Sequence, residues 1–311
     1  MDIVGKWRWF FLLSALVIIP GVVSLLIPPR LFLGIEFTSG STISIEFSSP
    51  VRLTDMKSAM TNLDHGEAII QTAGDNGYFV RIRTLQEAEA ANEISERQGI
   101  EEALAKLAPL DRFDVATVSP VIALDTVRNA FIAVSVASLA ILLYVSWSFR
   151  SVPKPFRYGV AAIAALTHDV LVVLGIFSIL GKAINLEVNA MFIPAILTVI
   201  GYSVNDTIVV FDRIRENVAN TPEIPFRRIV NRSILETLGR SLNTSFTTVV
   251  AISALLFLGG ESIRNFLLVL LVGVISGTYS SIGIGSQLLV VWETGEAART
   301  LRRFRLLPNR G

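Results

Sequence analysis

The sequence contains no cysteine and only two histidines, which removes several kinds of chemistry at once. Without cysteine there is no disulfide, no thiol nucleophile and no cysteine-ligated metal. The two histidines, His65 and His168, fall in segments that we expect on opposite sides of a membrane boundary. A zinc site built from histidine and carboxylate ligands would need both of them. We therefore expect neither a metal site nor a bound cofactor.

Charge is also scarce. Charged residues make up 17% of the 311 residues, against roughly 25% in an ordinary soluble domain. Lys and Arg (27) balance Asp and Glu (26), and the net charge of +1 provides no whole-chain basic field for nucleic acid. Hydrophobic residues make up 52% of the chain. This composition excludes an ordinary soluble protein and predicts a membrane protein without a nucleic-acid partner.

Long apolar runs account for this composition. An α-helix needs about 20 apolar residues to cross a bilayer. The first run is longer than the apolar part of a signal peptide and ends without an Ala-x-Ala site, so we interpret it as a retained helix. The sequence therefore predicts an all-α bundle of six transmembrane helices, at about 9–27, 129–149, 156–180, 190–211, 244–259 and 265–292.

Residues 28–126 have mixed charge and no long apolar run, which indicates one water-facing domain. Its apolar residues alternate where strands are expected and recur at helical spacing elsewhere. The resulting βαββαβ order predicts a ferredoxin-like α+β domain. The expected elements are a strand at 41–47, a helix capped by Thr54, strands at 68–71 and 78–82, a helix at about 86–107 and a strand at 113–118.

The distribution of Lys and Arg predicts the orientation, because positive residues are retained on the cytoplasmic side. One set of short loops holds only Lys182 and Arg264. The other loops and the chain ends hold Lys6, Arg8, Arg150, Lys154, Arg157, Arg213, Arg215, Arg227, Arg228, Arg232, Arg240, Arg299, Arg302, Arg303, Arg305 and Arg310. We therefore predict a cytoplasmic N-terminus and first helix (1–27), an exterior domain (28–126), helices two to six (127–292) and a basic cytoplasmic tail (293–311).

Ionisable groups inside the apolar runs are costly, and they commonly line a proton, ion or substrate path. Asp206 and the pair His168 and Asp169 are the leading candidates. Asp206 lies about 10 Å inside the expected end of its helix near Asp212. The carboxylate of Asp206 in a medium of low dielectric would change its proton occupancy when a cation or water reaches it.

The following helix is expected to enter the membrane at Arg240 with an unusually polar segment. Arg240, Thr244 and Thr247 share one helical face. Counting from Arg240, Thr247 and Thr248 reach about the depth of Asp206. We therefore predict a proton site in which these hydroxyls lie beside Asp206 and Arg240 approaches or withdraws. The supporting polar residues of this prediction are Ser203, Asn205, Asn243, Thr247, Thr248, His168 and Asp169.

Small residues recur along the last helix. Gly273, Gly277 and Ser280 form a stripe that allows a neighbouring helix to approach closely. We expect helix packing there.

Several segments resemble the SecF family of protein-export membrane proteins, part of the resistance-nodulation-division superfamily. The longest is GYSVNDTIVVFDRIREN at 201–217, with LGIEFTSG at 33–40, HDV at 168–170 and LNTSFTT at 242–248 in support. Glu36 and Ser39-Gly40 stand where the family usually carries Asp and Gly-Gly. The resemblance covers essentially the whole chain.

The resemblance implies a subunit that, with SecD, couples the proton-motive force to late steps of preprotein translocation and release. It implies a location in the bacterial inner membrane and no enzymatic activity. It identifies Asp206 and Arg240 as the proton-coupling residues. No SecD-like portion precedes residue 1, so we expect a separate subunit. The implied partners are SecD, the SecYEG channel, the unfolded preprotein, YajC and membrane lipids.

Three alternatives remain open from the sequence. In a scaffold of the translocon, the polar residues would only hold helices together. In an intramembrane aspartyl protease, Asp169 and Asp206 would form a dyad, although their depths differ and the expected Gly-x-Gly-Asp pattern is missing. A small-molecule exporter of the same superfamily would have repeated halves, of which this chain has one.

Overall fold

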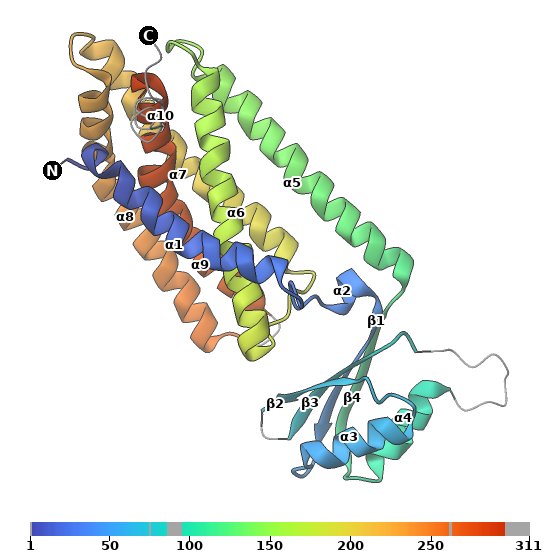
Figure 1. The fold of residues 1–311 in the computed structure, drawn as a ribbon. Coiled ribbons are helices and arrows are strands. Elements are labelled where there is room, and N and C mark those ends of the chain that lie inside the picture. Colours follow the sequence, from blue (N-terminus) through green and yellow to red (C-terminus); the bar gives the residue numbers. More distant parts are fainter. Residues whose placement is uncertain (1, 75, 86–94, 261–262, 296–311) are drawn as a thin grey trace, which may run out of the picture. The chain divides into compact units, whose positions relative to one another are not determined.

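The computed structural model describes residues 2–74, 76–85, 95–260 and 263–295 (Figure 1). The chain divides into two compact units. The helical unit comprises Met1–Phe32 and Phe131–Gly311, and the sheet unit comprises Leu33–Ala130. Helix α5 begins in the sheet unit at Pro120 and continues into the helical unit as far as Ser148.

In the described part of the chain, six helical segments are long and apolar enough to cross a membrane, as the sequence predicted. They extend further than the apolar runs, because several continue into charged segments. The elements are the 3₁₀ turn η1 (Val4–Lys6), α1 (Trp7–Leu26), α5 (Pro120–Ser148), α6 (Phe156–Ile184), α7 (Phe192–Asn220), α8 (Phe226–Leu258) and α9 (Arg264–Ser280), which the π-helical turn η3 (Ser281–Gly285) joins to α10 (Ser286–Thr294).

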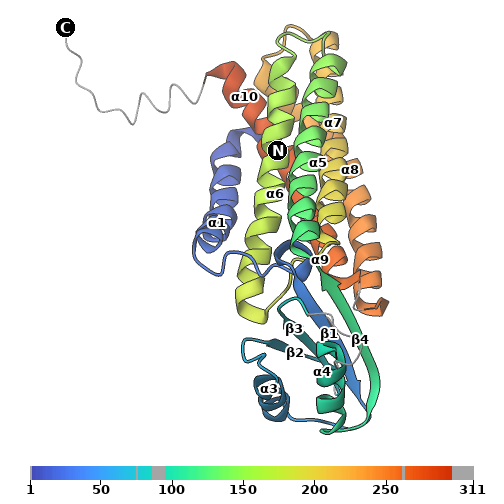
Figure 2. The ribbon, with the colours of Figure 1, turned by 90° about the vertical axis from the view of Figure 1, so that its right-hand side faces the viewer.

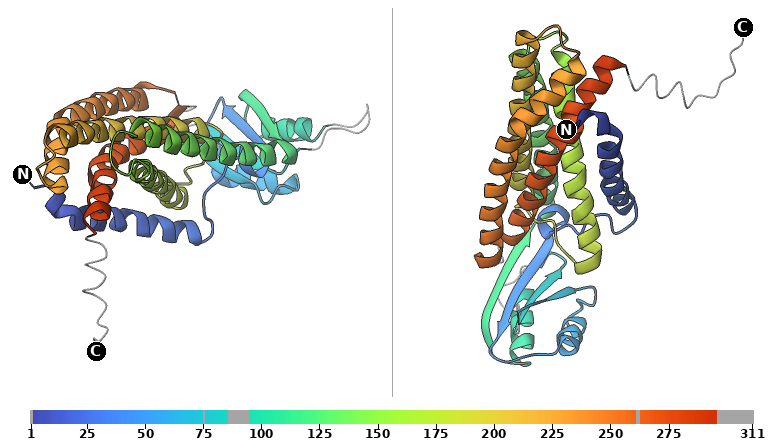
Figure 3. Two further views of the ribbon diagram at one scale, coloured as in Figure 1. Left: turned by 90° about the horizontal axis from the view of Figure 1, so that it is seen from above. Right: turned by 90° about the vertical axis from the view of Figure 1, so that its left-hand side faces the viewer.

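Helix α9 is the centre of the helical unit. It packs against α6, α7 and α8, while α1 lies along α6 (Figures 2 and 3). An aromatic cluster packs on α7 where the chain passes from α5 to α6: the ring of Tyr158 lies 5.4 Å from those of Phe149 and Phe211. The other fully buried residues of this hydrophobic cluster are aliphatic.

Glycine allows the closest helix contacts in this unit. A Cβ atom added to Gly273 of α9 would lie 2.1 Å from a methyl carbon of Val199, and one added to Gly277 would lie 3.0 Å from the Cβ of Ser203. The predicted small-residue stripe therefore packs directly against α7. A second contact joins α1 to α6, where a Cβ on Gly21 would lie 2.7 Å from the Cα of Gly175.

We expect Gly273→Ala to destabilise the helical unit by about 1–3 kcal/mol, the usual cost of overpacking. Val199 is branched at Cβ and cannot turn away without moving its backbone. Gly201→Ala on α7 is the matched control, because nothing lies within 4 Å of the added carbon and Ala is favoured in helices by up to about 1 kcal/mol. Thermal unfolding in detergent measures both. Equal midpoints for the two variants would contradict the close contact.

The described residues of the sheet unit form four strands, with two longer helices on one face. The strand order is β2-β3-β1-β4, and all neighbouring strands are antiparallel. Its core contains β-strand residues together with Met56 and Met60 of α3 and Ile100 and Leu104 of α4. The elements are α2 (Ile35–Thr38), β1 (Gly40–Phe47), α3 (Leu53–Asn62), β2 (Ile69–Ala73), β3 (Gly77–Ile82), α4 (Glu96–Ala105) and β4 (Leu110–Val118).

Two local predictions for this unit were wrong. Thr54 does not cap α3; the residue before the helix is Arg52, which has an extended backbone and no capping side chain. The helix expected over 86–107 is described only as α4, which ends at Ala105, while 86–94 lie outside the described residues. A capping box sets the start of α4. The Ser95 hydroxyl accepts a hydrogen bond from the backbone N–H of Gln98, and the Gln98 side-chain oxygen accepts one from the backbone N–H of Ser95.

Candidate functional site

Asp206 is buried near the middle of α7 and joins three elements of the helical unit. One carboxylate oxygen, Oδ1, accepts a hydrogen bond of 2.5 Å from the Ser241 hydroxyl of α8. The other, Oδ2, accepts one of 2.7 Å from the Ser281 hydroxyl of η3. Both partners are uncharged hydroxyls, which can also accept a hydrogen bond after rotation. The site can therefore hold Asp206 in its ionised or its protonated form.

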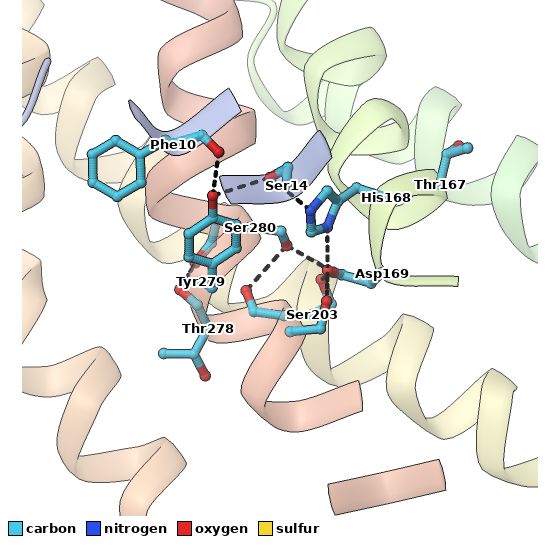
Figure 4. A network of polar contacts seen from close by, with 12 residues as sticks. Phe10, Ser14, Thr167, His168, Asp169, Ser203, Thr278, Tyr279 and Ser280 are labelled. Carbon is cyan, nitrogen blue, oxygen red and sulfur yellow. Dashed lines mark hydrogen bonds and ion pairs between the residues drawn. The ribbon is translucent and has the colours of Figure 1, made fainter. Parts of the chain in front are cut away.

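Asp169 of α6 is the centre of a second buried cluster, shown in Figure 4. Its Oδ2 accepts hydrogen bonds from the hydroxyls of Ser203 (2.6 Å) and Ser280 (2.7 Å). Its Oδ1 accepts one from the Ser276 hydroxyl (2.6 Å). The imidazole Nδ1 of His168 lies 3.0 Å from the same Oδ1. Three hydroxyl donors and one imidazole nitrogen thus surround one carboxyl group that is 1% exposed. Polar groups buried away from water need hydrogen-bond partners, and this carboxyl group has one for each of these four contacts.

Consecutive serines connect the two clusters. Ser280 ends α9 and donates to Asp169, whereas Ser281 begins η3 and donates to Asp206. Successive residues of a helix point about 100° apart, so one helix can serve carboxylates on two neighbouring helices. The π turn starts at this point, and the Ser286 hydroxyl donates to the Ser281 carbonyl. Single π turns within α-helices are frequent at functional sites.

The comparisons with known proteins agree with this architecture. The model of the family "Protein export membrane protein SecD/SecF, C-terminal" matches residues 100–295. The "Protein translocase subunit SecF" of Thermobaculum terrenum is 44% identical over 310 residues, 97% of each chain. This chain belongs to the SecD/SecF family. It is a multi-pass membrane protein with a role in protein translocation.

Two further relatives are fused proteins. The "Protein translocase subunit SecDF" of Bacillus subtilis is 35% identical over 95% of this chain, which spans 38% of that protein. The crystal structure of SecDF from Thermus thermophilus, titled a translocon-associated membrane protein, matches with a TM-score of 0.81 and 34% identity. That match covers 94% of this chain and 39% of the SecDF chain.

The structure places the hydroxyls around Asp206 differently from the prediction. Thr247 and Thr248 do not lie on the carboxylate; they donate to the carbonyls of Asn243 and Thr244 in their own helix. The prediction assumed that α7 ends near Asp212 and that α8 begins at Arg240. Both helices continue, to Asn220 and from Phe226. Counted from this hairpin, the residue of α8 level with Asp206 is Ser241.

The other predicted site residues divide into buried and exposed groups. Ser203, His168 and Asp169 are buried together in the second cluster. Arg240, Asn205 and Asn243 are exposed on α7 and α8. Within the described residues Arg240 has no ion pair, although the next residue, Ser241, contacts Asp206. Among the residues that the structure describes, Asp206 therefore has hydroxyl partners and no cation.

The residues that the sequence did not identify are serines. Ser241 and Ser281 bind Asp206, and Ser276 and Ser280 bind Asp169. A weak signal exists, since Ser276 and Ser280 are four residues apart and share a helical face. Serine is nevertheless a common packing residue between membrane helices, so this spacing alone does not indicate carboxylate partners. The described residues show no hydrogen bond between Asp169 and Asp206, which an aspartyl dyad would need.

Proposed function

We propose that this chain couples the proton-motive force to late steps of preprotein translocation and release, together with a SecD partner. Asp206 is the proton-binding residue, and its burial between three membrane elements is the observation that carries the proposal. Neutral hydroxyl partners suit a group that gains and loses a proton. A fixed cation beside Asp206 would instead hold it ionised.

Arg240 is the second residue of this proposal. It follows Gly239 and precedes Ser241 on α8, and it is exposed in the state described. A small rotation or shift of α8 relative to α7 would bring a cation toward Asp206, favouring its ionised form, and the reverse movement would favour proton uptake. A charge that crosses a potential of 100 mV supplies about 2.3 kcal/mol for such a cycle.

Exposed polar side chains on α7 and α8 support a partner within the membrane. Asn205, Asn243 and Thr247 are exposed on helices that contain the proton site, and amide side chains facing lipid are costly. The fused SecDF relatives contain a region that corresponds to this chain within a longer protein. We infer that SecD helices cover this polar face, and that Thr248, Ser203, His168 and Asp169 keep their predicted supporting role behind it.

The same proposal includes the location of the chain and its remaining partners. We propose the bacterial inner membrane, both termini in the cytoplasm, residues 28–126 on the exterior side and 293–311 as a cytoplasmic tail. The strand order β2-β3-β1-β4 supports a ferredoxin-like fold for the sheet unit. SecYEG, an unfolded preprotein, YajC and membrane lipids complete the assembly, in which the chain acts without enzymatic activity, as the translocase-subunit names of its relatives suggest.

Reconstitution with SecD and SecYEG in vesicles tests the function. Preprotein release on the outer side is measured with and without this chain, and with the proton gradient imposed or collapsed by an ionophore. We expect the gradient to increase release only when the chain is present. A scaffold would increase release equally in both gradient conditions, and that result would overturn the proposed coupling.

A further inference from the structure

A row of hydrogen bonds leads from a backbone carbonyl of α1 to Asp169 of α6 (Figure 4). The Tyr279 hydroxyl of α9 donates to the Phe10 carbonyl at 2.5 Å and lies 3.0 Å from the Ser14 hydroxyl. Ser14 Oγ lies 2.9 Å from Nε2 of His168, and the other ring nitrogen, Nδ1, lies 3.0 Å from Asp169. Three helices therefore meet along one continuous path.

The number of hydrogen atoms in this row fixes its protonation. A carbonyl only accepts, and each hydroxyl has one hydrogen to donate. Because Tyr279 donates to Phe10, the Ser14 hydrogen must point to Tyr279. Ser14 Oγ can then only accept from His168, so Nε2 must carry a hydrogen.

A second proton lies between His168 and Asp169. The contact of Nδ1 with Oδ1 needs one hydrogen, carried either by the imidazole or by the carboxyl group. In the first case the pair is an imidazolium and a carboxylate, and in the second both groups are neutral. The pair holds two protons and has zero net charge in either case.

We propose that His168 and Asp169 form a second proton-binding site, which releases its proton only when Ser14 and Tyr279 reverse their hydrogen bonds. This inference goes beyond proton coupling at Asp206 and does not depend on it. After proton loss, the Ser14 hydrogen turns to Nε2, the Tyr279 hydrogen turns to Ser14, and the Phe10 carbonyl loses the Tyr279 donor. The proton on the pair is thereby linked to the contact of α1 with α9.

The surroundings of the pair favour the form with zero net charge. Serines of α7 and α9 contact the carboxylate, and Ser14 of α1 contacts the imidazole. Tyr279 is the further titratable group of the row; its ring centroid lies 5.7 Å from that of His168. No Lys or Arg contacts the pair among the described residues, and Asp206 has its own hydroxyl partners. A net charge of −1 here would therefore have no cation to balance it.

Nitrogen-15 NMR of histidine-labelled protein in lipid vesicles tests this site directly. The chain has two histidines, so His65→Gln assigns the signal of His168. We expect Nε2 of His168 to carry a proton at pH 7. A deprotonated Nε2 at this pH would overturn the proposal. Export is not measured, so the outcome is independent of the proposed function.

A pair of tyrosine variants tests the reversal of the hydrogen bonds. In Tyr279→Phe the Ser14 hydrogen is free to turn to Nε2, so we expect this variant to lose the Nε2 proton more readily than the wild type as the pH is raised. Tyr202→Phe is the matched control, because its hydroxyl contacts Ser245 and lies outside the row. Identical titration of the two variants would show that Tyr279 does not control the proton.

Discussion

Replacing Asp206 by Asn is expected to abolish the stimulation of preprotein release by a proton gradient, while the chain still folds and assembles. An amide keeps the size of the carboxyl group and one acceptor oxygen but cannot bind or release a proton near neutral pH. One of the two hydroxyls, of Ser241 or Ser281, can rotate to accept from the new amide nitrogen. Packing is retained, and the proton step is lost.

The expected size of this effect follows from the driving force. One proton that crosses 100 mV provides about 2.3 kcal/mol. Used fully to lower a barrier, this corresponds to a rate factor of up to about 50. The measurement compares release by wild-type and Asp206→Asn complexes in vesicles with SecD and SecYEG, with the gradient imposed and collapsed. Equal assembly is first established by co-purification.

A matched control lies on the same helix. Asp212→Asn makes the same chemical change at an exposed carboxylate, which pairs with Arg215 at 2.6 Å. We expect this variant to retain gradient-dependent release, since exposed ion pairs contribute little. If Asp206→Asn also retains it, Asp206 is a packing residue and the coupling site lies elsewhere in the assembly.

Hydropathy predicted which segments are helical but underestimated the lengths of the helices. The apolar run at 190–211 became α7, which continues through charged residues to Asn220. In this extension Arg213 pairs with Glu236 of α8 at 2.7 Å, so packing between helices maintains the helix beyond its apolar part. A hydropathy pattern detects only the part of a helix that suits lipid. The two missed extensions explain why Thr247 was expected at the position that Ser241 occupies.

The sequence was sufficient to predict the ionisable residues of the candidate site, but not their hydrogen-bond partners. Asp206, Asp169 and His168 stand out because ionisable residues are rare in apolar runs. Their serine partners do not stand out, because hydroxyl side chains occur throughout membrane helices. Which serine faces which carboxylate depends on the register of α9 against α6 and α7. That register is set by close contacts such as Gly277 against Ser203, which the sequence alone does not specify.

Replacing Asp169 by Leu is expected to destabilise the helical unit more than any other single change considered. The carboxylate accepts from Ser203, Ser276 and Ser280 and contacts His168. Hydrogen bonds between membrane helices contribute about 0.6–1.7 kcal/mol each, so the loss of the three serine contacts amounts to about 2–5 kcal/mol. The imidazole also loses its acidic partner in a dry environment, which adds to the cost.

Thermal unfolding of the purified chain in detergent measures this loss. Thr167→Leu is the matched control: Thr167 is exposed two residues away on α6, and among the described residues its hydroxyl contacts only the Ile163 carbonyl of its own helix. It should unfold within about 0.5 kcal/mol of the wild type. Asp169→Asn should lie between the two, because its amide oxygen keeps part of the acceptor capacity. Unfolding of Asp169→Leu at the same temperature as Thr167→Leu would show that the three serine contacts do not hold the helices together. In that case the function of Asp169 would be its proton alone.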